Sequence, residues 1–500
     1  MLLSRTTKVL ALSLGNSLTA LVTLISGMVL ARVLSKTDLA TYRQTMLAYD
    51  VALPLLSLGL ASGIYYFLPT EKVRARGVLT EGLLLMIGMG LLYAVFIALG
   101  GNHLLAKRFS NPAIIPTLAF LVPLPILMLP AKLLPPVLVT QNRVQQLTTY
   151  NVVTALALAI GVIAACVAWE SPSAMVLARV GVSIVAGLAA IGLMFRAVPD
   201  GDWRPDWQHM KDMVVYSLPL AGAASLGAIH IQMDKLIVSS MCSPEEFAVY
   251  SNGAFQIPLI GILTGSIAAV IQPDLRRMVV EGNRSGALAL FRQSALKSAA
   301  LLFPAMFFML ICAEPLILTL FSAKYAGSIM PFRLYLLILP VRIIQFGSFM
   351  IVLGLNRVML YRAFAGLCAN LVMSIVLVRQ LGYLGAALST VICLYTVNCI
   401  LNFRAIGAAV GCRARDVLPF GELLRLGGYS LLASLPVGLL RMTFQPGMAP
   451  AWRLMLDSAV FAGSMGLVVW GFDVQSYKQE WSRLWMRVWA RLRPVREGAV

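Results

Sequence analysis

The stretch LTTYNVVTALALAIGVIAACVAW, from Leu147 to Trp169, contains no charged residue. An α-helix of this length spans roughly 30 Å, the thickness of the hydrocarbon core of a bilayer. Similar apolar runs recur along the chain, at Val9–Ala31, Leu79–Leu99 and Val214–Ser239. The ten-residue alternation typical of a membrane β-barrel is not seen. The sequence therefore predicts an all-α, polytopic membrane protein.

The overall composition supports this prediction. Hydrophobic residues make up 59% of the chain and charged residues 12%, with a mean hydropathy of +0.83. The seven cysteines show no paired CxxC spacing, and the three histidines lie far apart. No nucleotide-binding P-loop is found. We therefore expect no metal site, no cofactor and no catalytic residues.

Positive charges between the apolar runs predict the orientation in the membrane. About fourteen spans are predicted, at residues 9–31, 44–68, 79–100, 113–137, 147–169, 175–195, 213–241, 248–273, 292–313, 331–353, 361–379, 385–403, 425–441 and 452–472. Most of the 40 Lys and Arg residues fall on one side of these spans, and short loops rich in Lys and Arg stay in the cytoplasm. Both termini are therefore expected in the cytoplasm. Topology also explains the net charge of +19 without nucleic acid as a partner.

Short matches at a regular offset indicate an internal duplication. Ser35–Tyr42 and Ser243–Tyr250 share the pattern Ser-x-x-acid-apolar-Ala-β-branched-Tyr at a separation of 208. Phe195-Arg196 and Phe403-Arg404 repeat at the same separation. Asn142-Arg143-Val144 recurs as Asn356-Arg357-Val358.

The duplication predicts two lobes of six helices each. The predicted division is residues 1–200 and 201–410 for the lobes, 411–475 for two additional helices and 476–500 for a basic cytoplasmic tail. Because six is even, both lobes enter the membrane from the same side. A pseudo-two-fold axis along the membrane normal then relates them, as in transporters whose site lies between two lobes.

Charged residues inside the predicted spans are candidates for a functional site, because a charge at membrane depth costs about 2.5–3.5 kcal/mol on insertion scales. Lys132, Arg179, Lys297 and Arg333 lie near span ends, where the simpler interpretation is that they reach the headgroups. Arg342 lies in the middle of a span. Gln345 follows three residues later, so on a continuous helix the two share a face that suits an anionic ligand.

Acidic residues at depth form a second set of candidates. Asp234 and Lys235 are adjacent, so their side chains diverge by about 100° around a helix and do not face one point. Asp50 lies in another span, and with Asp234 it forms a candidate cation or proton pair, one in each half. An internal ion pair with neighbouring helices is the alternative. The span 113–137 holds five prolines and is expected to be kinked or broken.

Several motifs resemble those of a known family. Tyr216-Ser217-Leu218-Pro219-Leu220, then Asp234-Lys235 and the Ser243–Tyr250 loop, resemble the start of the second half in polysaccharide flippases of the Wzx type. Gly382-Tyr383-Leu384-Gly385-Ala386-Ala387-Leu388 is similar to the Gly-x-x-Gly-Ala-Ala segment of that family. The resemblance covers most of the first twelve spans. It implies membership of the superfamily that also contains MATE multidrug exporters and lipid II flippases.

The resemblance also implies a function. The cargo would be an oligosaccharide on a polyprenyl pyrophosphate, moved across the bacterial inner membrane. Arg342, Lys235, Arg333 and Gln345 would line the substrate site, and Asp234 and Asp50 would couple transport to H⁺ or Na⁺. Membrane lipids and polysaccharide-assembly proteins would be its partners.

Two other functions stay open at this point. One is a MATE-like exporter of drugs or small solutes, which would favour acidic and aromatic residues for cationic cargo. The other is a membrane polysaccharide polymerase or ligase. An enzyme of that kind would carry a large extracytoplasmic loop, whereas the longest one predicted here, residues 314–330, contains only Glu314 and Lys324 as charged residues.

Overall fold

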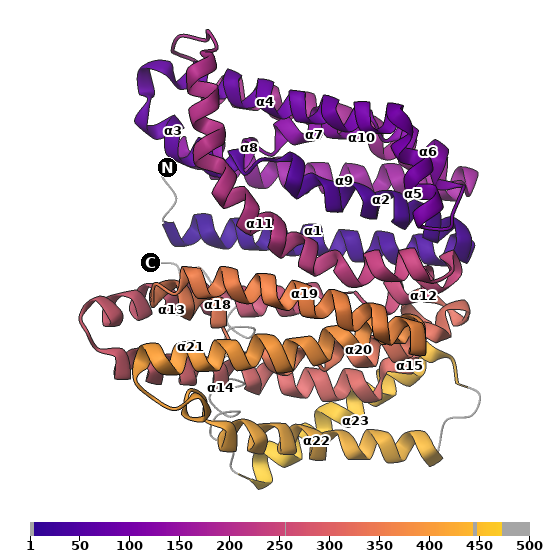
Figure 1. The fold of residues 1–500 in the computed structure, drawn as a ribbon. Helices are drawn as coiled ribbons and strands as arrows, with labels where there is room; N and C mark the ends of the chain where they lie inside the picture. The colour runs from indigo at the N-terminus through magenta and orange to yellow at the C-terminus, as the bar shows by residue number, and fades with distance from the viewer. Residues whose placement is uncertain (1–4, 256, 444–447, 473–500) are drawn as a thin grey trace, which may run out of the picture. The chain divides into compact units, whose positions relative to one another are not determined.

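The computed structural model describes residues 5–255, 257–443 and 448–472, and the regular elements in these ranges are helices (Figure 1). The predicted basic tail at 476–500 lies outside the described residues. Within the described ranges, 11 helical stretches are long and apolar enough to span a membrane. The prediction of an all-α, multi-pass membrane protein is confirmed. The full count of about fourteen crossings stays a prediction.

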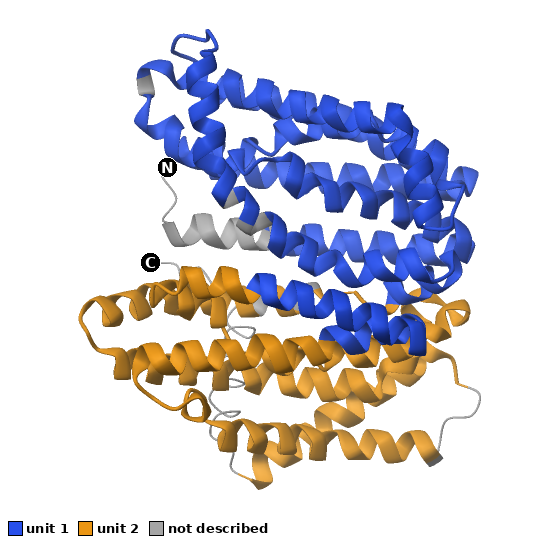
Figure 2. Ribbon diagram, in the orientation of Figure 1, with its two compact units in different colours: residues 1–252, 363–390 blue, residues 253–362, 391–500 orange. Residues whose placement is uncertain are grey.

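The chain forms two compact units (Figure 2), residues 1–252 with 363–390 and residues 253–362 with 391–500. These units do not follow the predicted boundaries at residues 200 and 410, and the lobe assignment stays a prediction.

The helices in the first half of the chain, up to residue 253, are α1 (Arg5–Val33), α2 (Lys36–Leu56), α3 (Leu60–Thr70), η1 (Lys72–Arg74), α4 (Ala75–Phe96), η2 (Ile97–Gly101), α5 (Asn102–Arg108), α6 (Ile114–Phe120), α7 (Pro123–Ala131), α8 (Leu134–Thr140), α9 (Val144–Trp169), α10 (Pro172–Ala197), α11 (Trp207–Met241) and α12 (Pro244–Gly253).

The remaining helices belong to the second unit, apart from the residues of α19 and α20 that belong to the first. They are α13 (Pro258–Val280), α14 (Arg284–Ile311), α15 (Ala313–Phe321), η3 (Ala323–Ser328), α16 (Ile329–Leu336), α17 (Leu339–Arg342), α18 (Phe346–Val352), α19 (Asn356–Leu381), α20 (Tyr383–Cys393), η4 (Leu394–Cys399), α21 (Ile400–Val410), η5 (Ala414–Asp416), α22 (Phe420–Thr443) and α23 (Pro450–Gly471). Residues 363–390 of α19 and α20 are part of the first unit.

Prolines and one glycine break the predicted spans of unit 1. The proline-rich span 113–137 is divided into α6, α7 and α8, because a proline inside a helix removes one backbone hydrogen bond and clashes with the preceding turn. The span 44–68 is divided at Gly59, whose φ of 64° is unstrained only for glycine. A Cβ at Gly59 would lie 2.9 Å from the carbonyl oxygen of Ser217, so α3 and α11 pack closely here.

The two copies of the repeat begin with the same local structure. In the first, the backbone N–H of Asp38 donates to the hydroxyl of Ser35. In the second, the N–H of Glu246 donates to Ser243, and the N–H of Ser243 donates to the carboxylate of Glu246. These capping contacts satisfy backbone groups that a helix start leaves free. Both α2 and α12 therefore begin at the serine that the repeat pattern places there.

Apolar packing holds each unit together. In unit 1 the core joins α3, α4, α7, α8, α10 and α11 through buried side chains such as Ile64, Val78, Leu133 and Met194. In unit 2 the rings of Phe291 and Phe349 stack with centroids 4.4 Å apart and join α14 to α18. Leucine, valine and isoleucine side chains stay exposed on several helices, including Val153 and Ile160 of α9. These surfaces suit contact with lipid.

Buried charges attach the last two described helices to unit 2. The guanidinium of Arg441 on α22 pairs with Asp457 on α23 at 3.0 Å. Arg441 also donates to the carbonyl of Ile311 at the end of α14. Asp457 is fully buried, and the thiol of Cys312 donates to it. One ion pair therefore ties α22 and α23 to each other and to the bundle.

Candidate functional site

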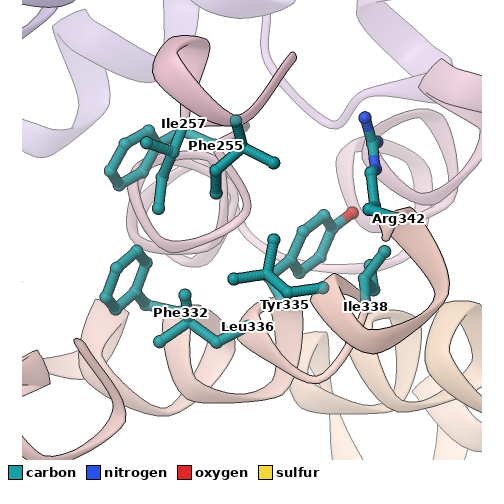
Figure 3. Close-up of a pocket in the computed structure, with 9 residues that line it drawn as sticks. Phe255, Ile257, Phe332, Tyr335, Leu336, Ile338 and Arg342 are labelled. Atoms are coloured by element: carbon teal, nitrogen blue, oxygen red, sulfur yellow. The ribbon is translucent and has the colours of Figure 1, made fainter. Parts of the chain in front are cut away.

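Unit 2 contains a small, partly open apolar recess with a cavity volume of about 40 Å³. Its lining comes from the start of α13 and the segment before it, and from α16 and α17 (Figure 3). The residues that line it are Phe255, Ile257, Ile260, Phe332, Tyr335, Leu336, Ile338, Leu339 and Arg342. Phe255 and Phe332 stack with ring centroids 5.4 Å apart and form part of this wall.

Arg342 is the charged residue of this lining. It ends α17, and its side chain is exposed. Among the described residues it has no hydrogen-bond or ion-pair partner. Figure 3 shows the hydroxyl of Tyr335 on the side of Arg342, Ile338 beside Arg342, and Phe255, Ile257 and Phe332 farther away. The recess thus presents a planar cation with free donors beside an apolar surface, an arrangement that suits an amphipathic anion.

The helix expected to carry both Arg342 and Gln345 is interrupted between them, and a substrate role for Gln345 stays a prediction. The helix ends at Arg342, and Gln345 precedes α18 with a φ of −82° and a ψ of 52°. The backbone leaves the helix at Ile343 and Ile344. Gln345 is half-buried and is not part of the recess lining.

Arg333 lies on α16 but does not line the recess. Its guanidinium donates to the carbonyl of Leu310 on α14 at 3.3 Å. This bond joins two helices of unit 2. The contact described for Arg333 is thus a structural one. A substrate role for this residue stays a prediction.

A second set of charges gathers in unit 1, and we call it the Asp50 group: Asp50, Lys132, Arg179 and Lys235. The charges of Arg179, Lys235 and Lys132 all act on the carboxylate of Asp50. Its members come from α2, the break between α7 and α8, α10 and α11. Asp50 and Lys132 are exposed, while Arg179 and Lys235 are half-buried.

Members of the Asp50 group make few direct bonds. Arg179 donates to the hydroxyl of Tyr42 at 3.5 Å, and its Nε has no partner among the described residues. Asp50, Lys132 and Lys235 have no hydrogen-bond or ion-pair partner within the described part of the chain. The expectation that Arg179 reaches the headgroups is wrong, because this side chain lies in the helix packing and bonds to α2.

Asp234 has a different environment from its neighbour Lys235. Its side chain is 3% exposed and accepts a hydrogen bond of 2.6 Å from the hydroxyl of Tyr250 on α12. Lys235 instead acts on Asp50. The predicted divergence of these two adjacent side chains is thus seen in their different partners. The pairing of Asp234 with Asp50 for ion coupling stays a prediction.

Sequence reasoning missed a polar cluster around His209. The two ring nitrogens of His209 face the carboxylates of Glu81 and Glu71, the latter at 2.9 Å. Glu81 is fully buried and also accepts from Arg74 and from the backbone N–H of Asp206, both at 2.8 Å. An imidazole donates at both nitrogens only when it is protonated. The cluster joins the start of α4 to the start of α11, and its residues are too far apart in the sequence to suggest a pattern.

Comparison with known proteins decides the family. Residues 29–330 match the model of the family described as polysaccharide biosynthesis protein. The chain belongs to this polysaccharide biosynthesis family. A 145-residue segment of this family member is 26% identical to the probable lipid II flippase MurJ of Rhizobium meliloti (strain 1021). That match covers 28% of this chain and 27% of the relative's length.

Solved structures of transporters share the fold. A lipid II flippase MurJ in an inward closed conformation superposes with a TM-score of 0.73 at 13% identity, over 92% of this chain and 98% of that one. An inward-facing multidrug resistance MATE family transporter of the MOP superfamily gives a TM-score of 0.58 at 14% identity, over 78% and 95%. The polysaccharide biosynthesis protein therefore has the MATE-like fold implied by its motifs.

A third solved structure concerns the polarity of the binding pocket in this fold. A MOP superfamily transporter from Pyrococcus furiosus, described as having a binding pocket of reverse polarity that suggests a different function, superposes with a TM-score of 0.56 at 14% identity. The likeness covers 80% of this chain and 96% of that one. The same fold thus carries pockets of different polarity in different proteins.

Proposed function

We propose that this protein is a flippase that moves a polyprenyl-pyrophosphate-linked oligosaccharide from the cytoplasmic to the outer leaflet of the bacterial inner membrane, for the synthesis of a cell-surface polysaccharide. The family and the flippase-like fold support a lipid-linked cargo. Alternating access would present the polar head first to one side of the membrane and then to the other.

The observation that carries this proposal is the position of Arg342 at an apolar recess. A lipid-linked sugar joins a hydrocarbon chain to a pyrophosphate, and the recess joins a hydrocarbon surface to a guanidinium. Arg342 keeps its donors free among the described residues, and guanidinium donors match phosphate oxygens in a bidentate manner. The first isoprene units would lie against Phe255 and Phe332, with the phosphate at Arg342.

Ion coupling and partners complete the proposal. Asp234 and Asp50 are the acids in the spans that would respond to an H⁺ or Na⁺ gradient. Lipids of the membrane and proteins of polysaccharide assembly would be the partners. Both chain termini would face the cytoplasm, as the distribution of Lys and Arg indicates.

A drug exporter of the same fold is the second candidate, and the likeness to a multidrug resistance transporter favours it. Exported drugs are commonly cations. The unpaired charges described in this protein are mostly basic, at Arg342, Lys132 and Lys235, and basic residues repel such cargo. The flippase is therefore the better supported function.

Complementation in cells tests the proposal. In a strain that lacks this gene, Arg342→Ala should abolish delivery of lipid-linked sugar to the outer leaflet while membrane levels of the protein stay normal. Arg342→Lys keeps the charge and should retain part of the delivery. Arg404→Ala, which removes an exposed arginine of α21 outside the recess lining, is the matched comparison. Full delivery by Arg342→Ala at normal protein level would remove Arg342 from the site.

A further inference from the structure

Four charged side chains of unit 1 form a buried cluster that the proposed transport does not use. We call Glu71, Arg74, Glu81 and His209 the His209 cluster. They come from the end of α3, from η1, and from the starts of α4 and α11. Glu81 is fully buried, and His209 is 8% exposed. Charges this far removed from water are stable only when they are paired and hydrogen-bonded.

The imidazole of His209 bridges two carboxylates. Its Nε2 lies 2.9 Å from Oε1 of Glu71, and its Nδ1 contacts Oε2 of Glu81. An ionised carboxylate only accepts hydrogen bonds, and a neutral imidazole has one N–H and one lone pair. Both contacts are therefore hydrogen bonds only when the cluster holds one additional proton, on the ring or on a carboxyl oxygen that faces it.

The same proton balances the charge of the cluster. Arg74 donates to Oε1 of Glu81 at 2.8 Å and lies 3.9 Å from Oε2 of Glu71. With the proton bound, two positive charges face two carboxylates. Without it, one guanidinium faces two carboxylates, and a lone pair of the ring points at a carboxylate oxygen. Loss of the proton therefore weakens the contact between His209 and one of the two glutamates.

Other charged groups of the packed elements do not take part in this bridge. Within the described residues, Glu71 and Glu81 are the acids within 4.0 Å of the ring nitrogens, and Phe67 of α3 packs edge-on against the ring with centroids 5.2 Å apart. The next titratable residue along α11 after Tyr216 is His230, about 30 Å further on. The remaining charged residues near the cluster are exposed or, for Arg76, lie over the ring of Phe195: Arg76, Lys132, Asp200, Asp202, Arg204, Asp206, Lys211 and Asp212.

The cluster holds an otherwise exposed part of the chain. Residues 198–206 connect α10 to α11 without a helix, and residues 199–208 are exposed. The backbone N–H of Asp206 donates to Glu81 at 2.8 Å, and the carboxylate of Asp206 accepts from the N–H of Gln208 at the start of α11. A Cβ at Gly201 would lie 3.0 Å from a backbone carbonyl of η1. The His209 cluster is thus the buried attachment of this connection to η1 and α4.

We propose that the His209 cluster is a proton-binding site that holds the α10–α11 connection against η1 and α4 and releases it when the proton leaves. Histidine is the side chain whose charge ordinarily changes between about pH 5 and about pH 8. Because the folded cluster keeps a proton that a free histidine releases above about pH 6.5, the stability that the cluster gives to the connection falls as pH rises. The predicted orientation places this connection in the cytoplasm, so the site responds to cytoplasmic pH.

The test is hydrogen exchange, followed by mass spectrometry, on the purified full-length protein in lipid nanodiscs at about pH 6 and about pH 8. Exchange rates are divided by the intrinsic rate at each pH, so that the readout is the protection of the amides of residues 199–210. In the wild-type protein this protection should fall about tenfold or more from the lower pH to the higher. Loss of a hydrogen bond to a charged group changes a local opening equilibrium by about this factor.

Two variants should have opposite effects. In Glu71→Gln the new amide donates to Nε2 of His209, and the neutral ring donates from Nδ1 to Glu81, so both contacts form without the additional proton. This variant should stay protected at both pH values. His209→Phe keeps a ring but removes both nitrogens, and its connection should be poorly protected at both. His103→Phe, at an exposed histidine of α5 in the same unit, should keep the pH dependence of the wild type.

Equal protection of the wild-type connection at the two pH values would overturn the inference. So would a Glu71→Gln protein that loses protection at both, because a purely structural contact is weakened by either substitution whatever the pH. The experiment needs no cargo. A wild-type protein that shows the pH dependence but flips no lipid-linked sugar would therefore remove the proposed function and leave the proton site in place.

Discussion

Thr37 donates a hydrogen bond of 2.7 Å to the carboxylate of Glu245, and the two residues are 208 positions apart. That offset is the one at which Ser35–Tyr42 repeats as Ser243–Tyr250. Arg43 donates to the hydroxyl of Ser251 at 2.5 Å across the same offset. When a chain contains two copies related by an approximate symmetry axis, equivalent residues of the two copies contact each other only near that axis. These contacts between α2 and α12 therefore support the duplication.

The Thr37–Glu245 contact has a consequence for titration. The hydrogen bond from Thr37 is the main reason that the pKa of Glu245 lies below its ordinary value, since a donor to the charged form stabilises it. Thr37→Val should raise the pKa of Glu245, as measured by NMR of a labelled carboxyl. Because the folded pKa is lowered, the stabilisation is present above the unfolded pKa of about 4.3 and is lost as pH falls through the folded pKa. An unchanged pKa would mean that the bond is absent in solution.

The hydrogen bond between Tyr250 and Asp234 should stabilise the fold. Tyr250→Phe removes the hydroxyl that donates to a carboxylate only 3% exposed. We expect a loss of about 1.5–3 kcal/mol, the range for a hydrogen bond to a charged group. Thermal unfolding in detergent measures it, with Tyr361→Phe as the control because Tyr361 is 66% exposed. Equal melting temperatures for the two variants would contradict the prediction.

Ion coupling should depend on Asp234. Asp234→Asn keeps the shape of the side chain and removes its charge, so flipping should respond less to an imposed H⁺ or Na⁺ gradient. Transport into proteoliposomes with and without each gradient measures the response. A response of wild-type size would count against Asp234 as the coupling residue.

Removal of one charge from the Arg441–Asp457 pair should lower the stability of the protein strongly, whereas replacement of both residues by apolar ones should lower it little. Asp457→Asn leaves a largely buried guanidinium without its counter-charge, which costs about 3–5 kcal/mol for a buried pair. The double variant Arg441→Met with Asp457→Leu removes both charges and should recover most of that stability. Thermal unfolding of the three proteins tests this. A double variant no more stable than Asp457→Asn would show that the charges themselves are needed.

Close packing explains why glycine occupies position 385 of the Gly-x-x-Gly-Ala-Ala segment. A Cβ at this position would overlap the carbonyl oxygen of Leu377 on the preceding helix, so Gly385→Ala should destabilise the protein by about 1–3 kcal/mol. Gly428 on α22 has nothing within 4 Å of such a Cβ, and Gly428→Ala should be neutral or stabilising. If Gly385→Ala melts at or above wild type, α20 does not pack as described.

The sequence predicted the fold well because lipid restricts it strongly. Apolar length identified 11 of the predicted spans, and the prolines at 123, 125 and 130 correctly indicated a broken helix. The repeat segments Ser35–Tyr42 and Ser243–Tyr250 were expected in loops, which is wrong, because each begins a helix at its serine. These apolar spans and the broken helix were predicted correctly. These features depend on local sequence, which can be read without knowledge of the tertiary contacts.

The site was predicted less completely. Arg342 was identified by its depth in a span, but the span was treated as one helix, whereas it is divided between Arg342 and Gln345, with Pro340 before the break and Gly347 after it. Lys132 and Arg179 were interpreted one by one because each lies near a span end, whereas their shared relation to Asp50 joins helices far apart in the chain. The Glu81–His209 cluster was missed for the same reason.

Flipping by the purified protein tests the central claim most directly. Proteoliposomes that contain a fluorescent polyprenyl-pyrophosphate oligosaccharide are treated with a membrane-impermeant quencher, and the rate at which inner-leaflet probe becomes accessible is measured. The account predicts protein-dependent flipping that Arg342→Ala reduces at least tenfold, while Arg404→Ala, at an exposed residue outside the recess, retains most of it. Flipping by Arg342→Ala at the wild-type rate, or no flipping by the wild-type protein under an imposed gradient, would contradict the account.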